Sequence, residues 1–138
     1  MPIKTLGSII KEIEAAPRKK QADLLIHYSC KQLKKIIGFA MDPGVRWLIP
    51  EGEVLYTALK PNSDAEGRLY HDVRMLDYFI DNKEYRGLRQ SKREQLFIEL
   101  LESVDPEDAR LLMRVKDKKL TIDKGAVKKA FPLISANW

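Results

Sequence analysis

The sequence predicts an all-α fold, a compact bundle of about six to seven helices, and three observations support this class. Apolar residues recur three and four positions apart in several segments, which places them on one face of a helix. Residues that favour helix starts, such as serine and aspartate, precede several of these segments. No strong strand pattern is present. The length of 138 residues suits one domain, 1–138, whose halves, roughly residues 1–60 and 68–134, are joined by a polar loop.

The first half of the chain predicts three helices separated by short breaks. Isoleucines recur at helical spacing within residues 4–15. Pro17 interrupts this pattern, and because proline is favoured in a first helical turn, a second helix is expected over residues 18–29. The inward face of this second helix includes Ile26. A third helix is expected over residues 31–39, with its lysines on the outward side.

The middle of the chain predicts an ordered loop. Residues 45–61 show no sustained period and contain prolines and a glycine, which interrupt regular structure. Within this loop we expect one short helix over residues 54–59. Residues 62–67 are polar, and we expect them to be exposed.

The second half of the chain predicts four further helices. One apolar face extends over residues 69–82. Ser91 and Glu94 match a capping box, in which each side chain accepts a hydrogen bond from a free backbone N–H at the helix start. Asp105 is the expected cap of the next helix, since a proline follows it. A last helix is expected from a cap at Asp123 to Phe131.

Positive charge is concentrated at the two ends of the chain. Residues 1–60 carry ten basic and six acidic side chains, residues 61–110 carry eight and twelve, and residues 111–138 carry seven and two. If the two basic ends meet in the fold, they form a positive face that attracts phosphates. The alternative is an ordinary surface with uneven charge.

Basic residues cluster where predicted helices begin, as in the run from Arg18 to Lys20. A helix start presents free backbone N–H groups, and nearby lysines add charge, so such clusters can hold phosphates without reading bases. No helix face carries the Asn, Gln and Arg side chains that read the major groove, which favours sequence-tolerant binding. For each single cluster, a solubilising surface is the alternative. The predicted contacts with DNA phosphates are Lys31, Lys34, Lys35, Arg89, Lys116, Lys118, Lys119, Lys124, Lys128 and Lys129.

Residues for catalysis, metal binding or cofactor binding are not apparent in the sequence. There is no glycine-rich phosphate loop. His27 and His71 lie far apart, and the single cysteine, Cys30, can form neither an internal disulfide nor a cysteine-based zinc site. The carboxylates within residues 72–81 fit a solvated helix face, with a metal cluster as the alternative. We therefore predict a protein that is not an enzyme and has no metal or cofactor.

Four segments in order carry a resemblance to a known family. They read LGSIIKEIEAAPRKKQADLL (6–25), CKQLKKIIGFAMDPGVRWLI (30–49), MLDYFIDN (75–82) and LMRVKDKKLTIDKGAVKKAFPLI (112–134). In order and spacing the chain resembles the N-terminal DNA-binding domain of phage-type ATP-dependent DNA ligases, as in the T-even phages. The resemblance implies a helical DNA-binding module whose closing helix–loop–helix touches the DNA backbone.

Two departures from the ligase pattern bear on function. The family's last loop contains a glycine, whereas this chain has Lys118-Lys119-Leu120-Thr121, with the nearest glycine at Gly125. The Lys-x-Asp-Gly motif of the nucleotidyltransferase domain is also missing from the chain. We therefore expect a stand-alone protein that does not ligate DNA.

The expected function is non-catalytic, largely sequence-independent binding of double-stranded DNA through its phosphate backbone, as an accessory protein of phage DNA replication or repair. The alternative is a protein-interaction module that docks on a sliding clamp, a replication protein or a host factor. For that role, residues 21–28 loosely match a clamp-binding peptide, and Trp138 is either exposed or folded onto the core. No stretch reaches the about 20 apolar residues of a membrane span, so the expected location is intracellular, in the host cytoplasm if phage-encoded.

Overall fold

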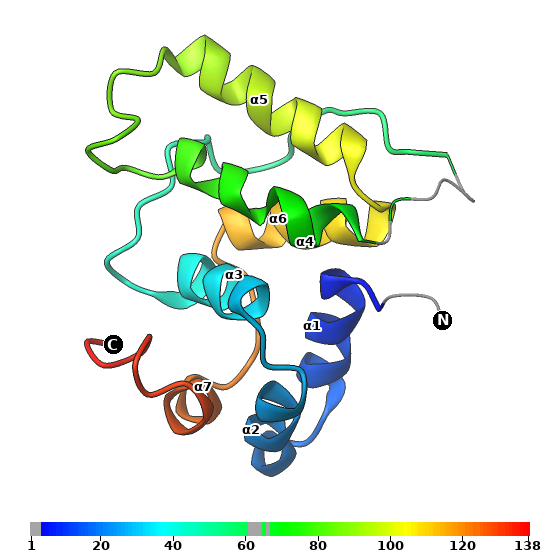
Figure 1. Ribbon diagram of the computed structural model, residues 1–138, viewed down its shortest axis with the longest axis vertical. Helices are drawn as coiled ribbons and strands as arrows, with labels where there is room; N and C mark the ends of the chain where they lie inside the picture. The colour runs from blue at the N-terminus through cyan, green and yellow to red at the C-terminus, as the bar shows by residue number, and fades with distance from the viewer. Residues whose placement is uncertain (1–3, 61–64, 66) are drawn as a thin grey trace.

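The computed structural model describes residues 4–60, 65 and 67–138, and its regular structure is helical (Figure 1). The all-α prediction is confirmed: the described residues contain no strand, only one isolated bridge between Trp47 and Ile80. The helices are α1 (Leu6–Ala15), α2 (Arg18–His27), α3 (Lys31–Met41), α4 (Arg68–Asp72), the 3-10 helix η1 (Val73–Phe79), α5 (Gln90–Ser103), α6 (Pro106–Lys116) and α7 (Lys124–Ala130).

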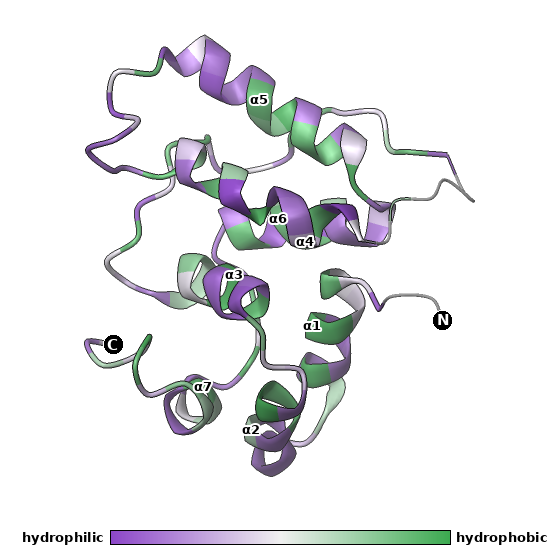
Figure 2. Cartoon of the chain, in the orientation of Figure 1, coloured by the Kyte–Doolittle hydropathy of each residue, from purple (hydrophilic) through white to green (hydrophobic). Residues whose placement is uncertain are grey.

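Helix α6 is central to the packing, because it contacts α1, α3 and α5. Figure 1 shows α5 at one end of the molecule and α2 with α7 at the other, with α1 and α3 between them. Buried apolar side chains from both halves of the chain form one core, and hydrophilic residues prevail on the outer side of α7 (Figure 2). Leu112 of α6 is among the fully buried members of this core. Burial of such a side chain contributes about 1.5–3 kcal/mol.

Helices α1 and α6 meet at their first turns. Gly7 N donates a hydrogen bond of 2.7 Å to Oδ1 of Asp108. A Cβ atom on Gly7 would lie 2.6 Å from the carbonyl oxygen of Glu107, so only glycine allows this approach. Asp108 is fully buried, and its Oδ2 has no hydrogen-bond partner. Burial raises the pKa of Asp108 to about 7; the N–H of Gly7 acts against this shift, and the neighbouring acidic groups add to it.

Two predicted caps are confirmed. The side chain of Asp105 accepts a hydrogen bond of 2.9 Å from Glu107 N at the start of α6, with Pro106 in the first helical position. The side chain of Asp123 accepts a hydrogen bond of 3.1 Å from Ala126 N at the start of α7. Both caps depend on residues close by in the sequence, which explains why they could be predicted.

The capping box predicted at Ser91 is not formed. Helix α5 begins at Gln90, so Arg89 rather than Ser91 is the cap residue, and no side-chain cap forms there. The amide of Gln90 donates to Glu94 Oε2 over 3.0 Å and to the carbonyl of Leu48 over 2.7 Å. Glu94 therefore binds the side chain of Gln90 rather than a backbone N–H of Ser91.

The single helix predicted over residues 69–82 is also wrong in part. Helix α4 is followed by the 3-10 helix η1, and the helical conformation ends before Ile80. The guanidinium of Arg93 donates to the carbonyl of Tyr78 over 2.9 Å, and Leu48 N donates to the carbonyl of Phe79 over 2.7 Å. These two carbonyls thus accept hydrogen bonds from groups distant in the sequence, instead of from backbone N–H groups of a next helical turn.

Three smaller predictions need correction or lie outside the described residues. Ile26 is 56 % exposed rather than inward-facing, because α2 lies at the periphery of the bundle. Residues 54–59 are not helical; Thr57 N instead donates to Glu102 of α5 over 2.7 Å. The expected exposed loop at residues 62–67 lies mostly outside the described part, and Ala65 within it is buried. In the described ranges, no helix combines the length and apolar character needed to cross a bilayer.

We expect Asp108 to make stability depend on pH. Because its folded pKa of about 7 exceeds its usual value of 3.8, the native state binds the proton more tightly. Stability should then fall as the pH rises from about 4 to about 7, by up to about 1.4 kcal/mol per pH unit. Asp108→Asn should remove this dependence, as urea unfolding at several pH values will measure. Asp23→Asn, at an exposed carboxylate, is the control; an unchanged slope in Asp108→Asn contradicts the assignment.

Candidate nucleic-acid interface

Half of the predicted phosphate contacts come from the α6–α7 loop and α7, and all of these are exposed. Among the described residues, no carboxylate lies within 4.0 Å of their ammonium groups. The two acidic residues of this segment are already engaged, Asp117 by Lys116 and Asp123 by Arg18. The positive charge of these five lysines therefore remains uncompensated at the surface. The lysines concerned are Lys118, Lys119, Lys124, Lys128 and Lys129.

The α6–α7 loop is ordered by Glu14 at the end of α1. Its carboxylate accepts hydrogen bonds from the guanidinium of Arg114 and from Thr121, at 2.7 Å from N and 2.9 Å from Oγ1. Burial alone would raise the pKa of Glu14, but these hydrogen bonds outweigh it and lower the pKa below its usual value. A single ionised side chain thus ties α6 and the loop to α1.

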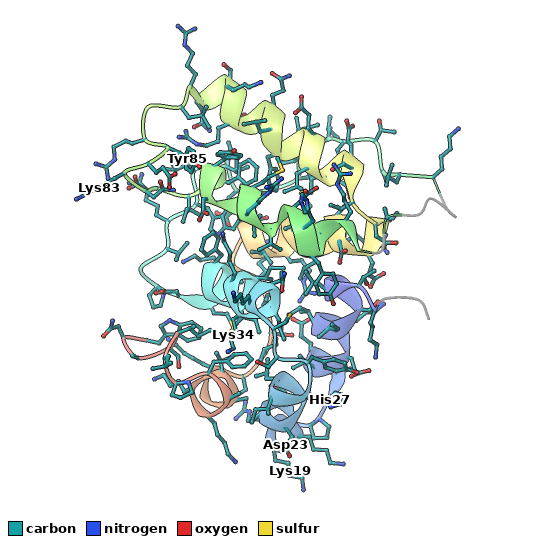
Figure 3. The ribbon with its side chains drawn as sticks, in the orientation of Figure 1. Lys19, Asp23, His27, Lys34, Lys83 and Tyr85 are labelled. Carbon is teal, nitrogen blue, oxygen red and sulfur yellow. The ribbon has the colours of Figure 1, made fainter. Side chains whose placement is uncertain are left out.

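Helices α2 and α7 begin side by side. Asp123 N donates a hydrogen bond of 2.8 Å to Oε1 of Gln21, and Arg18 Nε lies 3.3 Å from Asp123 Oδ1. Lys19 and Lys20, which lie between Arg18 and Gln21 in the sequence, are both exposed. Figure 3 shows Lys19 on the side of α2 that points away from the body of the molecule. Neither lysine was among the predicted contacts, although the basic run at the start of α2 was the available signal.

The lysines predicted on α3 do not share one surface. Lys34 Nζ lies 5.4 Å from the ring centroid of Phe131, directly after α7, and Figure 3 shows Lys34 directed toward that end of the molecule. Lys31 and Lys35 instead line a hollow on the other side of α3, beside α4 and η1. Lys35 is also neutralised, since its Nζ lies 3.0 Å from Oδ2 of Asp77.

The prediction that Lys116 contacts DNA phosphates is wrong, because its side chain is buried and cannot present its charge to DNA. Its Nζ donates to the carbonyl oxygens of Pro50 and Gly52, at 2.9 and 2.7 Å, and to Oδ1 of Asp117 at 2.5 Å. Its role is structural, because it fixes the irregular segment after α3. Arg89 is exposed but precedes α5, at the end of the molecule opposite α7 (Figure 1).

Lys118 adopts a left-handed backbone conformation at the end of α6, with a φ of 56°. Lys118 N donates to the carbonyl of Val115 over 3.0 Å, and Lys119 N donates to that of Arg114 over 2.9 Å. This pair of bonds is a Schellman motif, in which glycine usually occupies the left-handed position. Lys118 Nζ in turn donates to the carbonyl of Asp42 over 2.7 Å, just beyond α3.

The segment that loosely matched a clamp-binding peptide is part of the packing. Gln21 is buried, and its side chain binds Asp123 N and the carbonyl of Ala16. Trp138 packs against the core rather than extending into solvent. Gln21 and Trp138 are therefore both part of the packed structure rather than of an extended, exposed peptide. Docking on a sliding clamp stays a prediction.

The fold and this surface define a small all-α protein with uncompensated lysines around its last helix. The chain belongs to a family of unknown function (DUF6433), whose model matches residues 9–122. The match ends just before α7. No curated protein and no solved structure was found to match the chain. Among the described residues, no group of three or more His, Cys, Asp or Glu side chains is placed to hold a metal ion.

We expect Lys116→Met to destabilise the protein strongly. Removing the ammonium leaves Asp117 without its ion-pair partner and frees the carbonyls of residues 50 and 52. Such a change costs about 3–5 kcal/mol in comparable buried pairs. Urea unfolding will measure the decrease in stability. Lys119→Met, at an exposed position, is the matched control and should change stability little. Equal stability of the two variants would exclude the structural role of Lys116.

Glu14→Gln should destabilise the protein by about 1.5–3 kcal/mol near neutral pH, because the hydrogen bonds to the carboxylate are removed or weakened. The lowered pKa of Glu14 means that its contribution is present above its usual value of 4.5 and disappears as the pH falls through the folded value. The difference between wild type and variant should therefore shrink in acid. Thermal unfolding near neutral pH and in acid measures this; a constant difference argues against it.

Proposed function

We propose that the chain binds double-stranded DNA through its phosphate backbone, without reading bases and without a catalytic role, as an accessory protein of phage DNA replication or repair. The observation that carries this proposal is the uncompensated, exposed charge of the α6–α7 loop and α7. Each lysine that neutralises a phosphate releases bound counterions, which makes binding favourable and dependent on salt. The resemblance to ligase DNA-binding domains agrees with the same segment contacting DNA.

The arrangement of the basic side chains favours contacts with the backbone over contacts with bases. Lysines supply the exposed positive charge on α7, and a lysine ammonium binds a phosphate as a point charge. Further exposed lysines are Lys19 and Lys20 on α2, which packs against α7, and Lys34 on α3, which lies beside Phe131. A surface of this kind holds a duplex in place without specifying its sequence.

We expect the affinity for a labelled duplex of about 20 base pairs, measured by fluorescence anisotropy, to fall steeply between about 50 and 200 mM NaCl. The triple change Lys124→Gln, Lys128→Gln and Lys129→Gln should weaken binding. It should also make the log–log salt slope shallower by about 0.9 for each phosphate that the variant no longer neutralises. Two duplexes of unrelated sequence should bind alike.

The control for this test is the double change Lys83→Gln and Lys92→Gln. Both lysines are exposed and lie before or at the start of α5, away from α7; Figure 3 shows Lys83 pointing outward from its loop. This variant removes two positive charges, compared with three in the test variant, and should retain most of the affinity. No binding at low salt, binding independent of salt, or equally weakened binding in the two variants would each refute the proposal.

A further inference from the structure

A hollow of about 780 Å³ opens between the segment after α3 and the end of α6. Residues 43–51 form one wall and residues 116–118 the other. The volume lies within the range of about 300–1,000 Å³ that small-molecule sites occupy. The wall from residues 43–51 combines apolar side chains, Val45, Trp47 and Ile49 among them, with the charged side chains of Arg46 and Glu51.

The wall that contains Trp47 is held rigidly. Trp47 Nε1 donates to the carbonyl of Phe39 over 2.9 Å, so the indole is fixed against the end of α3. On either side of it, Leu48 N donates to the carbonyl of Phe79 over 2.7 Å, and Asp81 N donates to the carbonyl of Arg46 over 2.8 Å. The hollow is therefore formed before any ligand arrives, which lowers the entropic cost of binding.

The charged groups of the lining are one buried ion pair, two cationic side chains and one further carboxylate. The charges of Lys116 and Asp117 cancel in their buried pair. Arg46 and Lys118 are exposed members of the lining, and no described carboxylate lies within 4.0 Å of either cationic group. The hydrogen bond from Lys118 to the carbonyl of residue 42 holds its ammonium in place. Glu51 is the single other acidic residue of the lining.

Lys118 also begins the α6–α7 loop that leads to the lysines of α7. Along the chain, the α6–α7 loop thus joins one wall of the hollow to the helix proposed to hold duplex DNA. A ligand that suits both parts has a flat, largely apolar body and an attached anion, and a nucleotide in a DNA strand has both. An unpaired nucleotide can reach such a hollow, whereas a stacked and paired one cannot.

We propose that this hollow receives one unpaired nucleotide of a DNA strand, with its base against Trp47 and its phosphate at Arg46 and Lys118. The inference rests on the proposed duplex binding and adds a preference for DNA with an unpaired end or gap. Base contact with an aromatic side chain tolerates any base, so the preference concerns the form of the DNA rather than its sequence.

The first experiment compares a blunt duplex with the same duplex carrying a three-nucleotide single-stranded extension, by anisotropy at one salt concentration. We expect the extended duplex to bind about tenfold more tightly, the effect of a modest additional contact. Arg46→Gln should remove this difference and leave the affinity for the blunt duplex unchanged, because Arg46 lies outside the α6–α7 loop and α7. Arg74→Gln, which removes an exposed arginine elsewhere, is the matched control and should retain the difference.

The second experiment uses the fluorescence of Trp47, isolated by the change Trp138→Phe. An oligonucleotide of four linked thymidylates tests the hollow without a duplex. We expect this oligonucleotide and the extended duplex to quench the fluorescence of Trp47. The blunt duplex should change that fluorescence little. Equal affinity for blunt and extended duplexes, no quenching, or a preference that survives Arg46→Gln would each overturn this inference while duplex binding stands. If the blunt duplex does not bind but the thymidylates still quench Trp47 fluorescence, the proposed duplex binding is refuted instead.

Discussion

The last turn of α6 holds the irregular parts of the molecule in place. Arg114 meets Glu14 of α1, and Lys116 binds the backbone after α3. These two basic side chains point to different neighbours, since they are two residues apart on one helix. The loop that carries the exposed lysines depends on the first contact, and the wall of the hollow depends on the second. Helix α6 thereby positions both proposed parts of the DNA-binding surface without touching DNA through these side chains.

The helical class and most element boundaries follow from local chemistry, which the sequence displays directly. Asp105 and Asp123 cap helices through backbone groups two and three residues away, and no distant partner is needed. The errors occur where distant groups compete. Arg93 binds the carbonyl of Tyr78, and Gln90 binds that of Leu48, across separations of 15 and 42 residues. No periodic pattern contains such contacts, so the helix near residue 80 and the cap at Ser91 could not be predicted correctly.

The candidate surface was predictable to the extent that uncompensated charge follows from composition. Residues 111–138 contain few acids, and the exposed lysines of α7 reflect that imbalance. The partners of individual lysines were not predictable. Lys35 is neutralised by Asp77, which lies 42 positions away, and Lys116 is buried by a segment more than 60 positions before it. Helical spacing correctly placed the lysines of α3 on one helix. It could not show that Lys34 lies beside Phe131, whereas Lys31 and Lys35 lie beside α4 and η1.

The left-handed conformation of Lys118 has an evolutionary consequence. Any residue with a Cβ is disfavoured there by about 1–2 kcal/mol relative to conformations with negative φ, whereas glycine has no such cost. A lysine at this position therefore weakens the end of α6 while placing a cation in the lining of the hollow, beside the carbonyl of Asp42. Selection for stability alone favours glycine at this site, and selection for anion affinity favours lysine. Among relatives of this chain, the residue at position 118 should thus report which of the two pressures has prevailed.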